Sequence, residues 1–126
     1  MTQEEFIEIL DEKGYPYVIE GDKVIVNGEG DFYWELKTFP SGVEFRNEGN
    51  VDLKLLTTLH SDVEFNNDGN VLLYHLEKIH PSIRFNNSGY VSLILLITST
   101  IVWEGNIEGI GSKGLLNTMI KRGMFI

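Results

Sequence analysis

The sequence predicts a mainly β protein, a short β-solenoid of about four to five coils of roughly 20 residues each. A motif of the form Val/Ile-x-Phe-x-Asn-x-Gly-x-Val-x-Leu begins at Val43, Val63 and Ile83, at a constant interval of 20 residues. Within each copy the apolar positions alternate with polar or variable ones, as expected of strands with one buried face. The 42% hydrophobic content is enough to build a core. A fixed interval of this size indicates stacked copies, because one copy alone cannot bury its apolar face.

Residues 1–23 are expected to form an N-terminal cap made of a helix and the first part of a hairpin. Thr2 and Glu5 have the spacing of a capping box, and apolar side chains at helical spacing follow them. Gly14 is expected to end the helix, because glycine readily adopts the left-handed conformation. Residues 17–26 are apolar on both sides of a central Gly-Asp pair, which predicts a two-residue turn between two antiparallel strands.

Residues 24–102 are expected to contain the repeats. A degenerate first copy, residues 24–34, keeps the motif spacing but lacks its asparagine, and the full copies follow. Equivalent apolar positions of successive copies are predicted to stack as ladders that point into one shared core. These ladders are Phe45, Phe65 and Phe85; Val51, Val71 and Val91; Leu53, Leu73 and Leu93; Leu56, Leu76 and Leu96; and Phe39, Leu59 and Ile79.

The Asn-x-Gly part of the motif is expected to form the corner between two extended stretches. Its glycine is expected to take a positive φ, which costs glycine least. Its asparagine amide is expected to hydrogen-bond along the stack or to the turn itself. The glycines are Gly49, Gly69 and Gly89, and the asparagines are Asn47, Asn67 and Asn87.

The repeat can fold in two ways, and local chemistry permits both. In the first, each copy is one coil, with two short strands meeting at the corner and the leucine-rich part returning the chain one rung higher. In the second, the chain is a stack of β-hairpins, and a turn at 67–69 pairs Phe65 with Val71. The coil is favoured, because residues 76–83 with Pro81 are compact enough to return the chain.

Residues 103–126 are expected to close the array. Trp103 to Gly109 keeps the Asn and Gly of the motif but lacks its Phe, as a terminal repeat does. Ser112 is expected to open a C-terminal helix that ends at Gly123. The whole chain, residues 1–126, is then one domain with a helix covering each end of the array.

The segments 36–53 and 76–93 share the run Leu-x-x-Phe/Ile-(His)-Pro-x-x-Val/Ile-x-Phe-x-Asn-x-Gly-x-Val-x-Leu. This run resembles the short leucine-rich-like repeats of uncharacterised proteins from bacteria and their phages. The tail from Trp103, with its Glu-Gly-Asn-Ile-Glu-Gly-Ile sequence, resembles the closing segment of such proteins. The resemblance implies a leucine-rich-like solenoid and carries no function with it.

The composition excludes several kinds of partner. A net charge of −9 would repel nucleic acid and anionic membranes, so direct binding to either is not expected. With no cysteine, the fold has neither disulfides nor thiolate metal ligands. The first ten residues are acidic and amphipathic, unlike a signal peptide, and the apolar part of residues 86–103 is too short to span a bilayer. These features predict a cytoplasmic protein.

No catalytic or metal constellation emerges from the motifs, so no enzyme activity and no cofactor are expected. His60 and His80 occupy equivalent positions but lack a third ligand at a fixed spacing, which argues against a metal site. Glu44 and Glu64 are expected to form a like-charge ladder on an exposed strand face, and not the enclosed cleft that acid–base catalysis by a carboxylate pair requires.

The outward positions of the Val-x-Leu strand change along the array from charged to aromatic and apolar. Such a face, if the closing segment does not cover it, is typical of a protein-binding site. The predicted binding face consists of Asp52, Lys54, Leu72, Tyr74, Tyr90, Ser92 and Ile94.

The expected function is therefore non-enzymatic: a protein-binding or scaffold module, a monomer or weak homo-oligomer, that binds another protein through this face. Two alternatives follow from the charge and the resemblance. One is an acidic phage-encoded inhibitor of a host defence nuclease that mimics nucleic acid, and the other is a structural or virion-associated module. A charge mimic would lose its partner steeply as salt rises.

Overall fold

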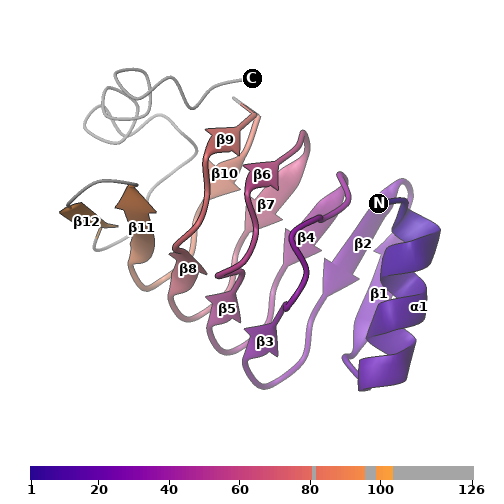
Figure 1. Ribbon diagram of the computed structural model, residues 1–126. Coiled ribbons are helices and arrows are strands. Elements are labelled where there is room, and N and C mark those ends of the chain that lie inside the picture. Colours follow the sequence, from indigo (N-terminus) through magenta and orange to yellow (C-terminus); the bar gives the residue numbers. More distant parts are fainter. Residues whose placement is uncertain (81, 96–98, 104–126) are drawn as a thin grey trace.

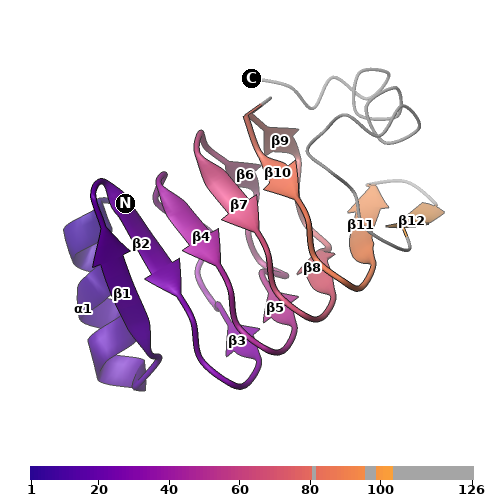
Figure 2. The same ribbon diagram turned by 180° about the vertical axis from the view of Figure 1, so that it is seen from behind.

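The computed structural model describes residues 1–80, 82–95 and 99–103, and it shows a β-solenoid of about three turns preceded by one helix (Figure 1). The strands step along the stack axis from the helical end towards the C-terminal end. Figure 2, turned by 180°, shows one row of these strands side by side from β1 to β10. The mainly β solenoid predicted from the repeat is confirmed.

Helix α1 spans Gln3–Lys13 and has the ends that its sequence predicts. Thr2 and Glu5 form both hydrogen bonds of the capping box, and Gly14 ends the helix with a φ of 74°. Strands β1 (Tyr17–Glu20) and β2 (Lys23–Val26) then form the predicted antiparallel hairpin.

The strands after β1 lie on three sides of the solenoid. Sheet A has the order β1, β2, β4 (Val43–Phe45), β7 (Val63–Phe65) and β10 (Arg84–Phe85). Sheet B has the order β3 (Phe32–Tyr33), β5 (Val51–Asp52), β8 (Val71–Leu73), β11 (Val91–Leu95) and β12 (Ser99–Trp103). Sheet C pairs β6 (Thr58–Leu59) with β9 (Lys78–Ile79) on the returning part of the coil, where no strand was expected.

The parallel register decides between the two ways of folding the repeat. Phe65 pairs with Phe45 in the preceding turn and with Phe85 in the following one. In a hairpin it would pair with Val71, which instead pairs with Val51 and Val91 in sheet B. Each copy is therefore one coil, and the hairpin alternative is wrong.

The core is a column of identical side chains from successive turns. The rings of Phe45, Phe65 and Phe85 are fully buried and stack nearly parallel, with centroids 5.2 and 5.1 Å apart. The valine and leucine ladders flank this column wherever the structure describes their burial. Burial of this kind contributes about 25 cal/mol for each Å² of apolar surface removed from water.

Helix α1 closes the first turn of the core. The ring of Phe6 lies 5.1 Å from Trp34 and 5.0 Å from Phe39, and Leu10 is fully buried beside them. At the other end, β12 runs antiparallel to β11, so the parallel order of sheet B stops there. The predicted terminal repeat after Trp103 and the predicted C-terminal helix from Ser112 lie outside the described residues.

Candidate interaction surface

The Asn-x-Gly corner is held together by its asparagine amides. Asn47 Nδ2 donates to the carbonyls of Gly30 (3.1 Å), Gly49 (3.3 Å) and Asn50 (3.2 Å). In the same way, Asn67 Nδ2 donates to the carbonyl of Gly49 in the preceding turn at 3.0 Å, and Asn87 Nδ2 donates to that of Gly69 at 3.1 Å. All of these asparagines are buried, so the amides satisfy backbone carbonyls that water cannot reach. The prediction that they hold the turn is confirmed.

The glycine of the corner is required for a reason that the sequence did not predict. Gly49, Gly69 and Gly89 do not have positive φ; in the described residues the glycines that do are Gly14, Gly21 and Gly42. A Cβ on Gly69 would instead lie 2.7 Å from the carbonyl carbon of Gly49, because the two turns approach closely there. The expectation of a left-handed corner was wrong, since the constraint is space and not φ.

A second ladder runs through the residue after the glycine. The side-chain oxygens of Asp31 and Asn50 each accept a hydrogen bond, at 2.8 Å, from the backbone N–H of Asn50 and Asn70 in the following turn. Asn70 bonds the N–H of Tyr90 in the same way at 3.1 Å. Tyr90 has no amide oxygen to offer a further turn, so this ladder ends where the parallel stack ends. Tyr90, predicted for the binding face, lies at this half-buried corner.

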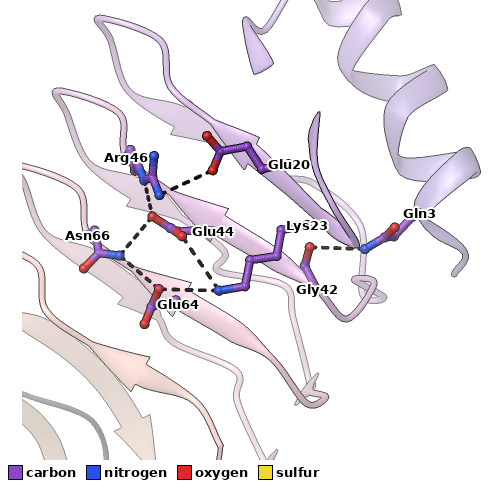
Figure 3. Close-up of polar contacts among 8 residues, drawn as sticks. All are labelled: Gln3, Glu20, Lys23, Gly42, Glu44, Arg46, Glu64 and Asn66. Atoms are coloured by element: carbon purple, nitrogen blue, oxygen red, sulfur yellow. Dashed lines mark hydrogen bonds and ion pairs between the residues drawn. The ribbon is translucent and has the colours of Figure 1, made fainter. Parts of the chain in front are cut away.

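The outer face of sheet A is closed by polar contacts among its own side chains (Figure 3). Glu44 is only 4% exposed, which contradicts the expected exposed strand face. Its carboxylate accepts hydrogen bonds from Arg46 Nε and from Asn66 Nδ2, the latter at 3.2 Å. The Nζ of Lys23 lies 3.9 Å from a carboxylate oxygen of Glu44 and 3.8 Å from one of Glu64. This shared cation relieves the repulsion between the two carboxylates.

The network joins two cations, Lys23 and Arg46, to the carboxylates around them, which gives it a structural role. The hydrogen bond from Arg46 to Glu44 raises the pKa of the Arg46 guanidinium above its ordinary value, so the cation persists at every accessible pH. The Nη2 of Arg46 also lies 3.8 Å from a carboxylate oxygen of Glu20 in β1, and so links the end of β4 to the hairpin. We therefore assign the outer face of sheet A to stabilising the stack.

The outer face of sheet B is built differently, because its residues differ from turn to turn. Tyr33, Asp52, Leu72 and Ser92 pair in one row across β3, β5, β8 and β11. Lys54 lies beside this row, with its Nζ 3.2 Å from Asp52 and 5.7 Å from the ring centroid of Tyr74.

The predicted binding face is only partly exposed. Lys54 is exposed, and Leu72 and Tyr74 are half-buried. Asp52 is 8% exposed, because its carboxylate is bonded to both the side chain and the backbone N–H of Lys54, and Ser92 is 3% exposed. The backbone of Ile94 pairs with Thr100, but the side chain of Ile94 lies outside what the structure describes.

The exposed apolar residues of this face lie nearer the N-terminal end than the sequence predicted. Tyr33 is 51% exposed and Leu55 is 41% exposed. A signal for Tyr33 was present, since it stands between the inward Phe32 and Trp34 of the degenerate copy. Leu36, which follows β3, is also exposed, and the offset of 19 residues by which β3 pairs with β5 matches it to the exposed Leu55.

Tyr33 is held in place from both sides. Its backbone N–H donates to the hydroxyl of Tyr15 at 3.1 Å, and that hydroxyl donates to the Tyr33 carbonyl at 3.3 Å. This satisfies the free edge of β3 at that residue. The Tyr33 hydroxyl donates to Asp31 at 3.1 Å, and this hydrogen bond raises the pKa of Tyr33, so the hydroxyl stays protonated at neutral pH.

Other kinds of site find no support in the described part of the chain. Its His, Asp and Glu side chains form no group of three or more that could hold a metal ion. His60 is exposed, and His80 contacts the Ser82 hydroxyl at 2.8 Å. Among the same residues no helix is long and apolar enough to cross a bilayer.

Comparison with protein-family models, curated proteins and solved structures finds no match for this chain. The resemblance to leucine-rich-like repeats of bacterial and phage proteins therefore stays a prediction.

Proposed function

We propose that this protein is a non-enzymatic binding module that engages another protein through the outer face of sheet B. The observation that carries the proposal is the contrast between the two outer faces. On β4 and β7 of sheet A the carboxylates are paired within the molecule, and the exposed apolar Val18 and Ile19 lie on the edge strand β1. On sheet B, Tyr33 and Leu55 are exposed beside charged side chains. Exposed aromatic and aliphatic side chains beside polar ones are typical of protein interfaces.

The charge of the chain favours a partner with basic as well as apolar surface. The net charge is −9, and the carboxylates of Asp31 and Glu35 flank Tyr33 in sequence. A basic partner is attracted over a distance of about 10 Å at moderate salt. An acidic nucleic-acid mimic is less well supported, because Glu44, Glu64 and Asp52 are paired with lysine or arginine.

Capture from a lysate of the native host tests the proposal with a matched pair of variants. The test variant is Tyr33→Ser with Leu55→Ser. The control is Val18→Ser with Ile19→Ser, which removes two exposed apolar side chains from β1, away from sheet B. We expect the test variant to lose a protein that the wild type and the control both retain at high salt.

Two outcomes would overturn the proposal. If the control loses the partner and the test variant keeps it, the interface lies at β1. If the captured protein is released steeply between low and high salt from all three proteins alike, a charge mimic fits better. Circular dichroism of each variant shows that the fold is retained.

A further inference from the structure

A shallow hollow lies on the outer face of sheet B, between the first and second turns. It has a volume of about 290 Å³ and combines aromatic, aliphatic and charged side chains. Its lining residues are Tyr33, Trp34, Glu35, Asp52, Lys54 and Leu55. The hollow therefore coincides with the exposed apolar residues that carry the proposed function.

Lys54 shows what kind of group this face binds. Its ammonium group lies 3.2 Å from a carboxylate oxygen of Asp52 and 5.7 Å from the ring centroid of Tyr74. A cation between a carboxylate and an aromatic face gains from both the charge and the ring quadrupole. The face thus already holds one cation, and this cation comes from the protein itself.

A second aromatic ring and a second carboxylate, those of Tyr33 and Glu35, line the hollow, which Lys54 also lines. Tyr33 pairs with Asp52 in the register of β3 and β5, and its ring is exposed. Within the described residues, Lys54 is the cation placed over a ring, and that ring is Tyr74. Glu35 adds an exposed carboxylate to the lining, whereas the carboxylate of Asp52 is already bonded to Lys54.

We infer that this hollow binds an arginine side chain of the protein partner. The planar guanidinium stacks on the Tyr33 ring and donates hydrogen bonds to the Glu35 carboxylate. Its methylene stem packs against Leu55. Arginine suits the hollow better than lysine, because the guanidinium is planar, weakly hydrated and carries several donors. The inference rests on the proposed function, since it names the anchor of that partner.

The test is a titration of the intact protein, followed by ¹⁵N NMR. The probe is the capped peptide N-acetyl-Leu-Arg-Leu-amide, and its control is the same peptide with uncharged citrulline in place of arginine. We expect the arginine peptide to shift the indole N–H of Trp34 and the amides of Tyr33 and Leu55. We expect the citrulline peptide to bind at least about fivefold more weakly, because the charge–ring and charge–carboxylate attractions are lost.

Glu35→Gln and Glu48→Gln form a matched pair for the same titration. Both glutamates are exposed, but only Glu35 lines the hollow, whereas Glu48 lies at the Asn-x-Gly corner. We expect Glu35→Gln to weaken the arginine peptide severalfold and Glu48→Gln to leave its affinity unchanged. Equal effects of the two variants, equal binding of the two peptides, or no shift at these residues would overturn the inference.

Failure of the inference and failure of the proposed function give different results. If the arginine peptide does not bind but Tyr33→Ser with Leu55→Ser still abolishes capture, only the arginine anchor is wrong. If that variant retains its partner, the outer face of sheet B is not the interface at all.

Discussion

The Asn-x-Gly corner and the outer face of sheet B belong to the same turns but obey opposite rules. At the corner, successive turns carry the same residues and make the same bonds, because each turn must fit against the one before it. On the outer face of sheet B, the equivalent positions are Tyr33, Asp52, Leu72 and Ser92. Sequence that repeats maintains the stack, and sequence that varies on a rigid stack is free to recognise a partner.

Loss of a corner amide is expected to have the largest effect on stability. Asn67→Ala removes the donor to the carbonyls of Gly49 (3.0 Å) and Asn70 (3.3 Å). Because the site is buried, we expect the free energy of unfolding to fall by about 2–4 kcal/mol in urea denaturation. The exposed neighbour Asp68 supplies the control, and Asp68→Ala should change the free energy of unfolding by less than about 0.5 kcal/mol. Similar losses in both variants would argue that the amide ladder does not hold the corner.

Two glycine substitutions separate the effect of a close contact between turns from the effect of reduced chain flexibility. Gly69→Ala places a Cβ 2.7 Å from the carbonyl carbon of Gly49, so we expect the free energy of unfolding to fall by about 1–3 kcal/mol. Gly30 has the equivalent position in the first turn, and a Cβ there meets no atom within 4 Å. Gly30→Ala should therefore be neutral by the same thermal or urea measurement. If both substitutions were equally harmful, contact between turns would not explain the glycine.

The outer face of sheet A is expected to behave like the corner and unlike sheet B. Glu44→Ala leaves Arg46 and Asn66 without their shared acceptor, and we expect a loss of about 1–2 kcal/mol in the free energy of unfolding. Glu48→Ala, at an exposed turn position, is the control and should be close to neutral. If Glu44→Ala left the free energy of unfolding unchanged, the outer face of sheet A would not stabilise the stack.

The smallest effect on stability is expected on the outer face of sheet B. Tyr33→Ser with Leu55→Ser removes side chains that are largely exposed, so the midpoint of thermal unfolding should match that of the wild type. Scanning calorimetry of the two proteins measures this directly. A large fall in the midpoint would show that these residues stabilise the stack, and the contrast with the corner would be lost.

The sequence alone predicted the parts of the fold that depend on local chemistry and on the repeat. The capping box at Thr2, the left-handed Gly14, the hairpin turn and the buried Phe65 column each follow from residue type and spacing. The role of Gly69 could not be predicted, because an Asn-x-Gly sequence suits a left-handed turn as well as a close contact between turns.

The surface was harder to predict than the core, because exposure depends on which neighbours cover a residue. Glu44 alternates with inward residues and was expected to be exposed, yet Arg46 and Asn66 cover it. Asp52 was assigned correctly to the outer face of sheet B, but Lys54 hides its carboxylate. Contacts of this kind join residues by side-chain reach across turns, which the motif does not encode.

Site-specific photo-crosslinking to the captured partner shows directly whether the outer face of sheet B is the interface. A benzoylphenylalanine residue in place of Leu55 samples the outer face of sheet B, and the same residue in place of Ile19 samples the exposed part of β1. We expect a covalent adduct with the partner from position 55 and none from position 19. An adduct from position 19 alone would contradict this expectation and assign recognition to the N-terminal cap.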